Sequence, residues 1–257
     1  MTPRHGIAMG WRRSRPLSRL ALLGFSLALL CGLLAMLAGF GSRFGLWHFR
    51  TGFTLLRWMA YGGLAAAAIS LIGLIMTFIG RGQRGAVLAL LGIVIGLSVA
   101  AVPWQWRRVA RGVPPIHDIT TDTENPPQFV SILPLRADAP NPPEYAGAEV
   151  AEQQRTAYPE LGPLVLPVRP EQAFARALEA ARGMRWEIVD ANASEGRIEA
   201  TDRTFWFGFA DDVVIRVTPT PEGSRIDARS KSRVGGSDVG TNARRIRRYF
   251  DRVQREG

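Results

Sequence analysis

The only cluster of imidazole and carboxylate side chains lies shortly after the last long apolar run of the chain. His117 and Asp118 are followed there by Asp122 and Glu124. Such groups can bind a hard metal ion or exchange protons as an acid–base pair. We take His117, Asp118 and Asp122 as candidate metal ligands, although their spacing matches no named metal-binding motif. The alternative, which we favour, is a structural arm whose Asp and Thr side chains bond nearby backbone groups in turns.

A second pair of carboxylates, Asp211 and Asp212, stands where a glycine-containing loop enters an expected strand. Two adjacent carboxylates can share a proton or hold a cation. Neighbouring residues of a strand point to opposite faces of a sheet, however, so these two side chains should diverge. We expect a structural role, in which one of them pairs with Arg216 or with the basic face of the last strand. An enzyme that uses Asp211 and Asp212, or His117 and Asp122, is the alternative.

The most concentrated polar run follows the last expected strand, where Gly235, Gly236 and Gly240 lead to the start of a helix. Glycines before a helix N-terminus can present backbone N–H groups to an anion. The candidate anion-binding residues are Arg229, Lys231, Arg233, Asp238, Asn242, Arg244 and Arg245. The alternative is a tight turn in which Asp238 or Thr241 caps the helix. The run is not a P-loop, because no Lys-Ser/Thr pair follows the glycines.

Other catalytic arrangements have no support in the sequence. The C-terminal half contains a single histidine and no G-x-S-x-G motif, which argues against a Ser-His-Asp hydrolase. The only cysteine, Cys31, lies in the first apolar run, so that half has no thiol nucleophile. A dinucleotide-binding fingerprint is also missing. We expect no cofactor, and we place a binding function before an enzymatic one.

The elements that must position these residues are expected to form an α+β domain. The sequence PEQAFARALEAARG (170–183) has apolar residues at helical spacing, proline in its first turn and Gly183 as a candidate C-cap. Four strand-like runs follow at residues 185–190, 197–204, 212–218 and 225–234. A second helix closes the chain. The predicted order is α-β-β-β-β-α, an antiparallel four-stranded meander with helices on one face.

Alternation along the last strand places a row of charged residues on one face, which we expect to point outward. This row is Arg225, Asp227, Arg229, Lys231 and Arg233. The closing helix has an apolar stripe at positions 246, 249, 250 and 253, which should face the core. The arginines around this stripe, including Arg244, Arg247 and Arg248, are expected to join the strand residues in one outer basic layer.

A proline-rich arm, residues 113–169, precedes the regular part of this domain. Residues 113–170 hold 12 of the 17 prolines, and proline favours extended backbone. A free tether would be polar, yet the arm contains large apolar residues. We expect these residues to pack along the domain: Ile116, Ile119, Phe129, Val130, Ile132 and Leu133.

Residues 1–112 have the features of a membrane module. Three runs without charge, at about 20–40, 58–80 and 85–104, are each long enough to cross a hydrocarbon layer of about 30 Å as a helix. The first run is longer than the apolar region of a signal peptide. Gly92 with Gly96, and Gly63 with Ala67, have the spacing that allows helices to approach closely. We therefore expect the three spans to pack on one another.

Charge divides the chain at the same place. Residues 1–112 contain 13 basic and no acidic residues, whereas residues 113–257 contain 19 basic and 22 acidic ones. The basic excess adjoins the spans, where it fits membrane topology and lipid headgroups, so nucleic acid is not an expected partner. Five arginines precede the first span and one follows it closely, which favours a cytoplasmic N-terminus. Three spans then place the C-terminal domain in the periplasm, if the membrane is a bacterial inner membrane.

Two stretches, PPIHDITTDTENPPQF (114–129) and RSKSRVGGSDVGTNARRIRRYF (229–250), resemble the bacterial and plastid family named domain of unknown function 1499. The segment TFWFGFADDVVIRV (204–217) also resembles it, and the resemblance covers about residues 113–255. The three spans resemble a membrane module attached to some members. Because no activity is assigned to the family, the resemblance implies a fold and its boundaries but no catalytic residues.

Three hypotheses follow for function. The first is a non-enzymatic, membrane-anchored binding module outside the cytoplasm, whose ligand is a small anion, a lipid headgroup or a partner protein of the cell envelope. The second is an enzyme that uses the carboxylates named above, with or without a metal ion. The third is a scaffold whose spans assemble with a larger membrane complex.

Overall fold

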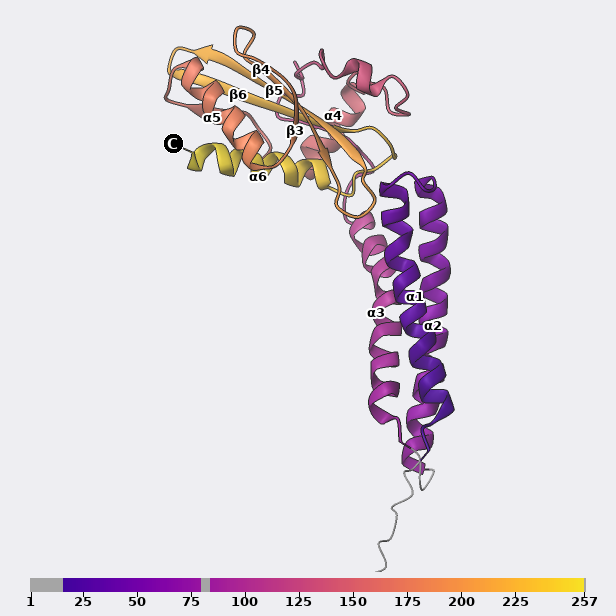
Figure 1. The fold of residues 1–257 in the computed structure, drawn as a ribbon. Coiled ribbons are helices and arrows are strands. Elements are labelled where there is room, and N and C mark those ends of the chain that lie inside the picture. Colours follow the sequence, from indigo (N-terminus) through magenta and orange to yellow (C-terminus); the bar gives the residue numbers. More distant parts are fainter. Residues whose placement is uncertain (1–15, 80–83, 257) are drawn as a thin grey trace, which may run out of the picture. The chain divides into compact units, whose positions relative to one another are not determined.

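The computed structural model describes residues 16–79 and 84–256, which divide into two compact units. The first unit contains most of three long helices, α1 (Arg19–Arg43), α2 (Phe49–Ile79) and α3 (Ala86–Arg111), whereas the end of α1 from Phe40 and the end of α3 from Gln105 belong to the second unit. The three helices are drawn in indigo to magenta in Figure 1. Each is long and apolar enough to cross a membrane. The apolar runs expected from the sequence lie within these helices, except for Gly85, which precedes α3, and Gly80, which lies outside the described residues.

Small residues bring the three apolar helices together. A Cβ atom added at Gly63 of α2 would lie 2.6 Å from the carbonyl oxygen of Gly96 on α3, and one added at Gly96 would collide with the carbonyl of Gly63. Gly24 of α1 is equally close to Ser70 of α2. Larger side chains at these positions would force the helices apart. The expected close packing of the spans is therefore confirmed.

The second unit is built on an antiparallel sheet of six strands, not four. The strands are β1 (Asp118–Thr120), β2 (Leu164–Leu166), β3 (Glu187–Asn192), β4 (Arg197–Arg203), β5 (Ala210–Thr220) and β6 (Gly223–Ser232). Their order is β1-β6-β5-β4-β3, and β2 also pairs with β6. The predicted meander corresponds to β3 through β6. The two additional strands have three residues each, which is too short for alternation to reveal them.

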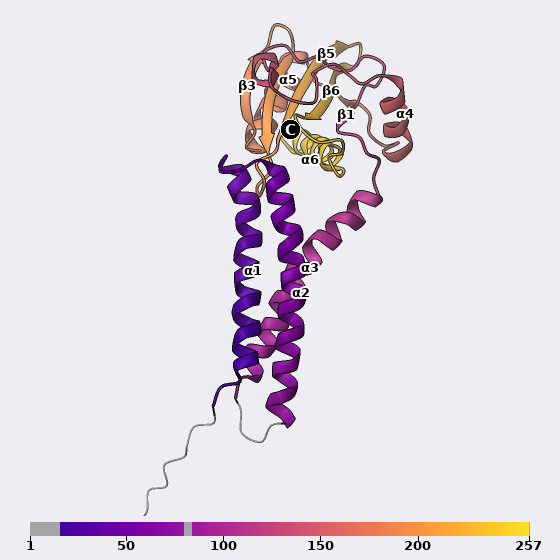
Figure 2. The same cartoon turned by 90° about the vertical axis from the view of Figure 1, so that its right-hand side faces the viewer.

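Two helices lie side by side against one face of the sheet, α5 (Pro170–Gly183) and α6 (Thr241–Arg255) (Figure 1). A further helix, α4 (Ala148–Ala157), lies beyond β1 at the edge of the sheet, where Gln154 bonds both backbone groups of Thr120 at 3.0 and 2.6 Å (Figure 2). The sequence analysis did not predict α4. Its composition is mostly polar, so it has only a weak apolar stripe.

The end of α5 differs from the expectation. Gly183 is the last helical residue rather than the C-cap, which is Met184, and the positive φ of 61° falls on Arg185. A Cβ atom at Gly183 would meet the guanidinium group of Arg252 on α6, which lies at the end of a flexible, 43% exposed side chain and can move aside. Gly183 is therefore a point of close approach between α5 and α6 rather than the C-cap.

The main hydrophobic core lies between the sheet and the two helices. Alternate residues of β4, β5 and β6 face it, among them Ile198, Val213, Ile215, Ile226 and Ala228. The apolar stripe of α6 packs against them, with Tyr249 fully buried and its hydroxyl donating to the carbonyl of Ala177 at 2.9 Å. The stripe was thus assigned correctly.

The arm covers the opposite face of the sheet. Phe129 and Ile132 are buried there against Val214 of β5, and a short 3-10 helix, η1 (Leu133–Arg136), follows them. Ile116 and Ile119 are buried in the main core, as expected. Val130 and Leu133, in contrast, are 52% and 41% exposed. The expectation was wrong for these two because only one side of the arm faces the sheet.

Candidate functional site

The charged row of β6 faces the arm, and its three central residues are buried, whereas the side chains of Arg225 and Arg233 are 36% and 17% exposed. Arg229 and Asp227 are 0% exposed and Lys231 is 1% exposed, so the expected outward basic face does not exist. Alternation correctly placed these residues on one face of the strand. It could not show that a segment more than 80 residues earlier in the chain covers that face. The arginines of α6 lie on the other side of the sheet, and the expected single basic layer is therefore also wrong.

Asp118 occupies the centre of this buried layer. It stands on β1 directly opposite Lys231 of β6. Its two carboxylate oxygens accept hydrogen bonds from Nε and Nη2 of Arg229, at 2.9 and 2.8 Å, and from Nζ of Lys231 at 2.9 Å. The remaining donors reach arm carbonyls: Arg229 donates to Pro127 and Pro143 at 3.2 and 2.8 Å, and Lys231 donates to Glu144 at 2.6 Å.

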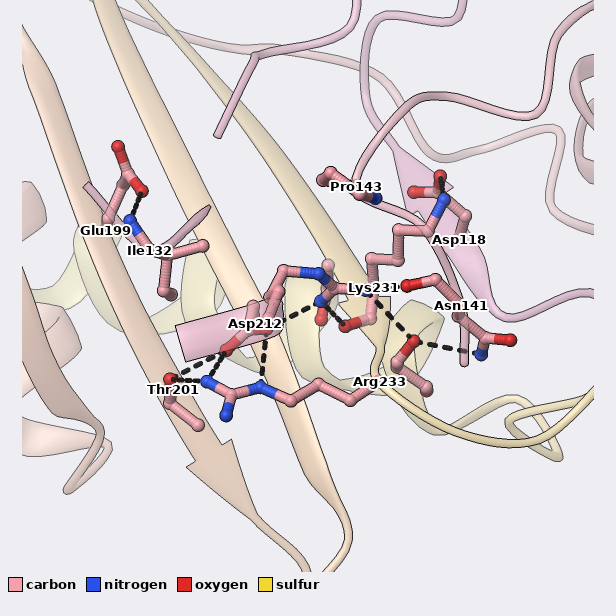
Figure 3. A network of polar contacts seen from close by, with 12 residues as sticks. Asp118, Ile132, Asn141, Pro143, Glu199, Thr201, Asp212, Lys231 and Arg233 are labelled. Carbon is pink, nitrogen blue, oxygen red and sulfur yellow. Dashed lines mark hydrogen bonds and ion pairs between the residues drawn. The ribbon is translucent and has the colours of Figure 1, made fainter. Parts of the chain in front are cut away.

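A second buried carboxylate, Asp212 of β5, lies on the same face (Figure 3). Arg136 of η1 donates to it at 2.6 Å, and Arg233 donates to both of its oxygens at 2.8 and 2.7 Å. The hydroxyl of Thr201 on β4 is also 2.7 Å away. Asp212 therefore joins the arm to two strands of the sheet.

These contacts leave an excess of positive charge in the buried layer. We use the term cationic cluster for four cations, Arg136, Arg229, Lys231 and Arg233, and the two carboxylates that they bind, Asp118 and Asp212. The next carboxylates along the layer, Asp122 and Asp227, pair with a different set, Arg216 and Arg225.

Burial of this positive charge is unfavourable, because removing a cation from water costs free energy that only a close anion returns. Burial accordingly lowers the pKa of Lys231 and the pKa of Arg136, although Asp118 and Asp212 act in the opposite direction. An additional negative charge beside these cations would therefore be energetically favourable.

Two buried donors beside the cationic cluster have no hydrogen-bond acceptor among the described residues, Nε of Arg136 and the hydroxyl of Tyr145, and Nε of Arg216 farther along the layer is a third. The guanidinium carbon of Arg229 lies 5.5 Å from the ring centroid of Tyr145 and 4.9 Å from that of Phe129. The guanidinium carbon of Arg136 lies 5.5 Å from the ring centroid of Phe129. Burial, with a smaller effect of Asp118, raises the pKa of Tyr145 to about 12, so its hydroxyl keeps its proton at neutral pH.

Glu199 of β4 attaches the arm to the sheet. It is 0% exposed, and its oxygens accept backbone N–H groups of Val130 and Ser131 at 3.0 Å each and of Ile132 at 2.9 Å. Arg197 pairs with the same carboxylate. The sequence analysis did not single out Glu199. The available signal was an acidic residue between the apolar positions Ile198 and Ala200 of a strand.

The candidate metal ligands are not assembled into a site. Asp118 is bound by its two cations, whereas Asp122 accepts the N–H groups of Glu124 and Asn125 at 3.2 and 2.8 Å in a local turn. His117 is half-buried, and burial together with nearby Lys231 lowers its pKa. Among residues 16–79 and 84–256, no group of three His, Cys, Asp or Glu side chains is placed to hold a metal ion.

The remaining candidates lie on the helix side of the sheet. Asp211 pairs there with Arg245 at 2.5 Å, so the two adjacent carboxylates diverge as expected. Asp238 accepts the N–H groups of Gly240 and Asn242 at 2.7 and 2.8 Å, and so it caps α6 with its own carboxylate.

The seven candidate anion-binding residues therefore form two groups on opposite faces of the sheet. Arg229, Lys231 and Arg233 lie under the arm, whereas Asp238, Asn242, Arg244 and Arg245 lie at the start of α6. Asn242 is already bonded to Ser230 at 2.8 Å, and Arg244 is exposed. Only the group under the arm belongs to the cationic cluster.

Comparison with known proteins gives one family match, and it lies within the second unit of the chain. The family model described as "Protein of unknown function (DUF1499)" matches residues 118–253, from the first residue of β1 into the last turns of α6. The match includes every residue of the cationic cluster and Glu199, and it confirms the resemblance noted in the sequence. No curated protein matches the chain. Since the match covers more than half of its length, the chain belongs to the DUF1499 family of proteins of unknown function.

Proposed function

We propose that the protein is a membrane-anchored, non-enzymatic binding module whose ligand carries a phosphate or carboxylate group, and that this group binds in the cationic cluster. The observation that supports the proposal is the excess of four cations, three of them buried and Arg233 17% exposed, over two buried carboxylates. A bound anion would offset the cost of burying that charge. Charge-assisted hydrogen bonds from arginine to an anion are also stronger than bonds to a neutral carbonyl.

Movement of the arm gives the anionic ligand a route into this site. Arg229 and Lys231 direct donors to the arm carbonyls of Pro127, Pro143 and Glu144, which are neutral acceptors that an anion can replace. In our proposal, the arm moves when the ligand enters. The unpaired donors of Arg136 and Tyr145 then contribute to its binding.

Catalysis has less support. Each carboxylate of the enzymatic alternative is engaged: Asp122 by Arg216 and Arg225, and Asp212 by Arg136 and Arg233. Asp211 is engaged by Arg245 in the same way. These carboxylates neutralise arginine instead of facing a substrate, which favours a structural role for them.

The location of the module is also a proposal. Three candidate spans support anchoring in a membrane. The distribution of arginines around the first span favours a cytoplasmic N-terminus and therefore a periplasmic C-terminal domain in a bacterial inner membrane. A reporter enzyme that is active only outside the cytoplasm, fused after Gly257, should be active. Activity of a cytoplasm-only reporter at that position would contradict this topology.

Binding can be tested on the full-length protein in uncharged detergent micelles. Thermal unfolding is followed in increasing inorganic phosphate, with chloride at equal ionic strength as the reference. A ligand at 100 times its Kd raises the unfolding free energy by about 2.7 kcal/mol, so a specific phosphate effect is measurable. Arg136→Gln should abolish the phosphate effect. Arg155→Gln, which changes an exposed arginine of the same arm paired with Glu152, should preserve it. Equal phosphate responses in both variants would refute the site.

A second candidate is weak binding to an anionic lipid surface, and the charge of the two long helices favours it. Residues 170–183 and 241–255 contain eight basic and three acidic residues, whereas the rest of residues 113–257 contains 11 basic and 19 acidic ones. Each exposed arginine near anionic headgroups gains about 1 kcal/mol. Salt-sensitive binding of this helix face to anionic lipid can be measured by adding soluble anionic lipid micelles to the protein. The double variant Arg244→Gln, Arg248→Gln should bind these micelles less than the parent does. Equal binding by the parent and the double variant would remove this candidate.

A further inference from the structure

The connection between β4 and β5 is the most aromatic segment of the second unit. Residues 204–209, TFWFGF, contain four aromatic side chains and no charge. Phe205 is 79% exposed, more than any other large apolar side chain among the described residues. Its ring packs edge-on against Phe40, with centroids 5.6 Å apart, and lies 5.9 Å from the guanidinium carbon of Arg43, and its remaining exposed area can contact a further surface.

The loop is held in a defined shape by its own bonds and by Arg43 of the same compact unit, whose Nη1 donates to the carbonyls of Thr204 and Phe205 at 2.9 and 2.6 Å. The N–H of Thr204 donates to the carbonyl of Phe209 at 2.9 Å, and the N–H of Phe209 donates to the hydroxyl of Thr204 at 2.9 Å. Gly208 has a φ of +70°, and its N–H donates to the carbonyl of Thr204 at 3.0 Å. Phe207 and Phe209 stack with ring centroids 5.4 Å apart. Bonding of these backbone groups lowers the cost of moving the loop out of water.

The loop lies at the end of the sheet where the chain enters the domain. The last pair of β4 and β5 joins Arg203 to Ala210, whose carbonyl accepts the N–H of Arg233 at 3.0 Å. One residue earlier on β6, the N–H of Ser232 donates to the carbonyl of His117 at 2.9 Å. The aromatic loop, the end of β6 and the start of β1 therefore share one end of the sheet.

That end of the domain has a short covalent tether. Asp118, the first residue of β1, follows the last residue of α3, Arg111, by seven positions. Seven residues span at most about 25 Å even when fully extended. Since α3 is a candidate membrane span, a tether of this length leaves the end of the sheet that carries the loop within reach of the bilayer.

We propose that residues 204–209 form a membrane-docking loop, which inserts Phe205 into the interfacial layer of the bilayer that holds the chain's own spans. Aromatic rings are favoured at this layer of a bilayer. Arg203, whose side chain is 51% exposed beside the loop, adds attraction to anionic headgroups. Docking through the loop would fix the orientation of the domain on the membrane independently of ligand in the cationic cluster.

The test uses the full-length protein in lipid vesicles. The only cysteine is replaced, Cys31→Ala, and a single cysteine for an environment-sensitive fluorophore is introduced by Phe205→Cys. Val165→Cys provides the matched control. Val165 is an exposed apolar residue, 52% accessible, and it pairs with Arg225 at the opposite end of β6. Thermal unfolding of both labelled proteins establishes that they are folded, as expected for substitutions of exposed side chains.

Spin-labelled lipids that quench at the interface distinguish the outcomes. We expect a blue-shifted emission and strong quenching for the label at 205, and neither for the label at 165. Equal quenching at the two positions, or none at 205, would overturn the proposal. A blue shift at 205 without lipid quenching would also overturn it, because the loop would then contact protein.

Discussion

Replacement of Glu199 by glutamine should release the arm from the sheet. The carboxylate is fully buried, and it accepts three consecutive backbone N–H groups of the arm, those of Val130, Ser131 and Ile132. It also forms an ion pair with Arg197. Glutamine has nearly the same shape, so the change removes charge and one acceptor without opening a cavity.

The magnitude follows from these contacts. Glutamine offers one carbonyl oxygen, and its NH₂ group must face a backbone N–H on the other side. At least one buried donor then lacks an acceptor, which costs about 1–3 kcal/mol. Loss of the buried ion pair with Arg197 adds to this cost, since breaking such pairs typically costs about 3–5 kcal/mol. The two effects overlap, and we expect the arm to be held about 3 kcal/mol less tightly, which corresponds to about a hundredfold.

Hydrogen–deuterium exchange of the full-length protein measures directly how tightly the arm is held to the sheet. Peptides that contain residues 130–132 should exchange about a hundredfold faster in Glu199→Gln than in the parent. Glu195→Gln is the matched control, because Glu195 also pairs with Arg197 but is 57% exposed, and exposed pairs contribute about 1 kcal/mol or less. Parent-like exchange of the arm in Glu199→Gln would refute the attachment that we describe.

Three further predictions concern stability, measured as thermal unfolding of the full-length protein. Asp118→Asn should cost about 3–5 kcal/mol because it leaves buried cations uncompensated, whereas Lys231→Met should be nearly neutral or stabilising; equal losses would contradict the charge excess. Burial lowers the pKa of His117, so the folded state binds fewer protons than the unfolded state, and stability should rise with pH up to the ordinary value of 6.5. His117→Gln should flatten that part of the profile, and an unchanged profile would disprove the assignment. Gly196→Ala should cost at least about 1–2 kcal/mol, because its φ is +62° and a Cβ would strike a carbonyl oxygen, whereas Gly162→Ala should be tolerated.

The regular elements could be predicted because their signals are local. The stripe of α6 and the alternation of β5 and β6 each depend on residues only a few positions apart. The divergence of Asp211 and Asp212 followed from the same rule. Packing of the arm was predicted only in part, because large apolar residues indicate burial but not which side of the segment meets the sheet.

The candidate site could not be predicted because its contacts are distant in sequence. Asp118 and Arg229 are 111 residues apart, and nothing near either residue indicates that one neutralises the other. A row of charges in a strand normally faces water, and the cover supplied by the arm reverses that assignment. The strands β1 and β2 were missed for the same reason, since pairing with β6 defines them more than their own three residues do.

The most direct test of the central claim is a calorimetric titration of inorganic phosphate into the full-length protein in uncharged micelles at constant ionic strength. If the cationic cluster is an anion-binding site, the parent should show saturable binding of one phosphate per chain. Removal of one cation by Lys231→Met should weaken that binding, whereas Arg155→Gln, on the exposed surface of α4, should not change it. The absence of saturable binding in the parent, or equal affinity in the parent and Lys231→Met, would contradict the account.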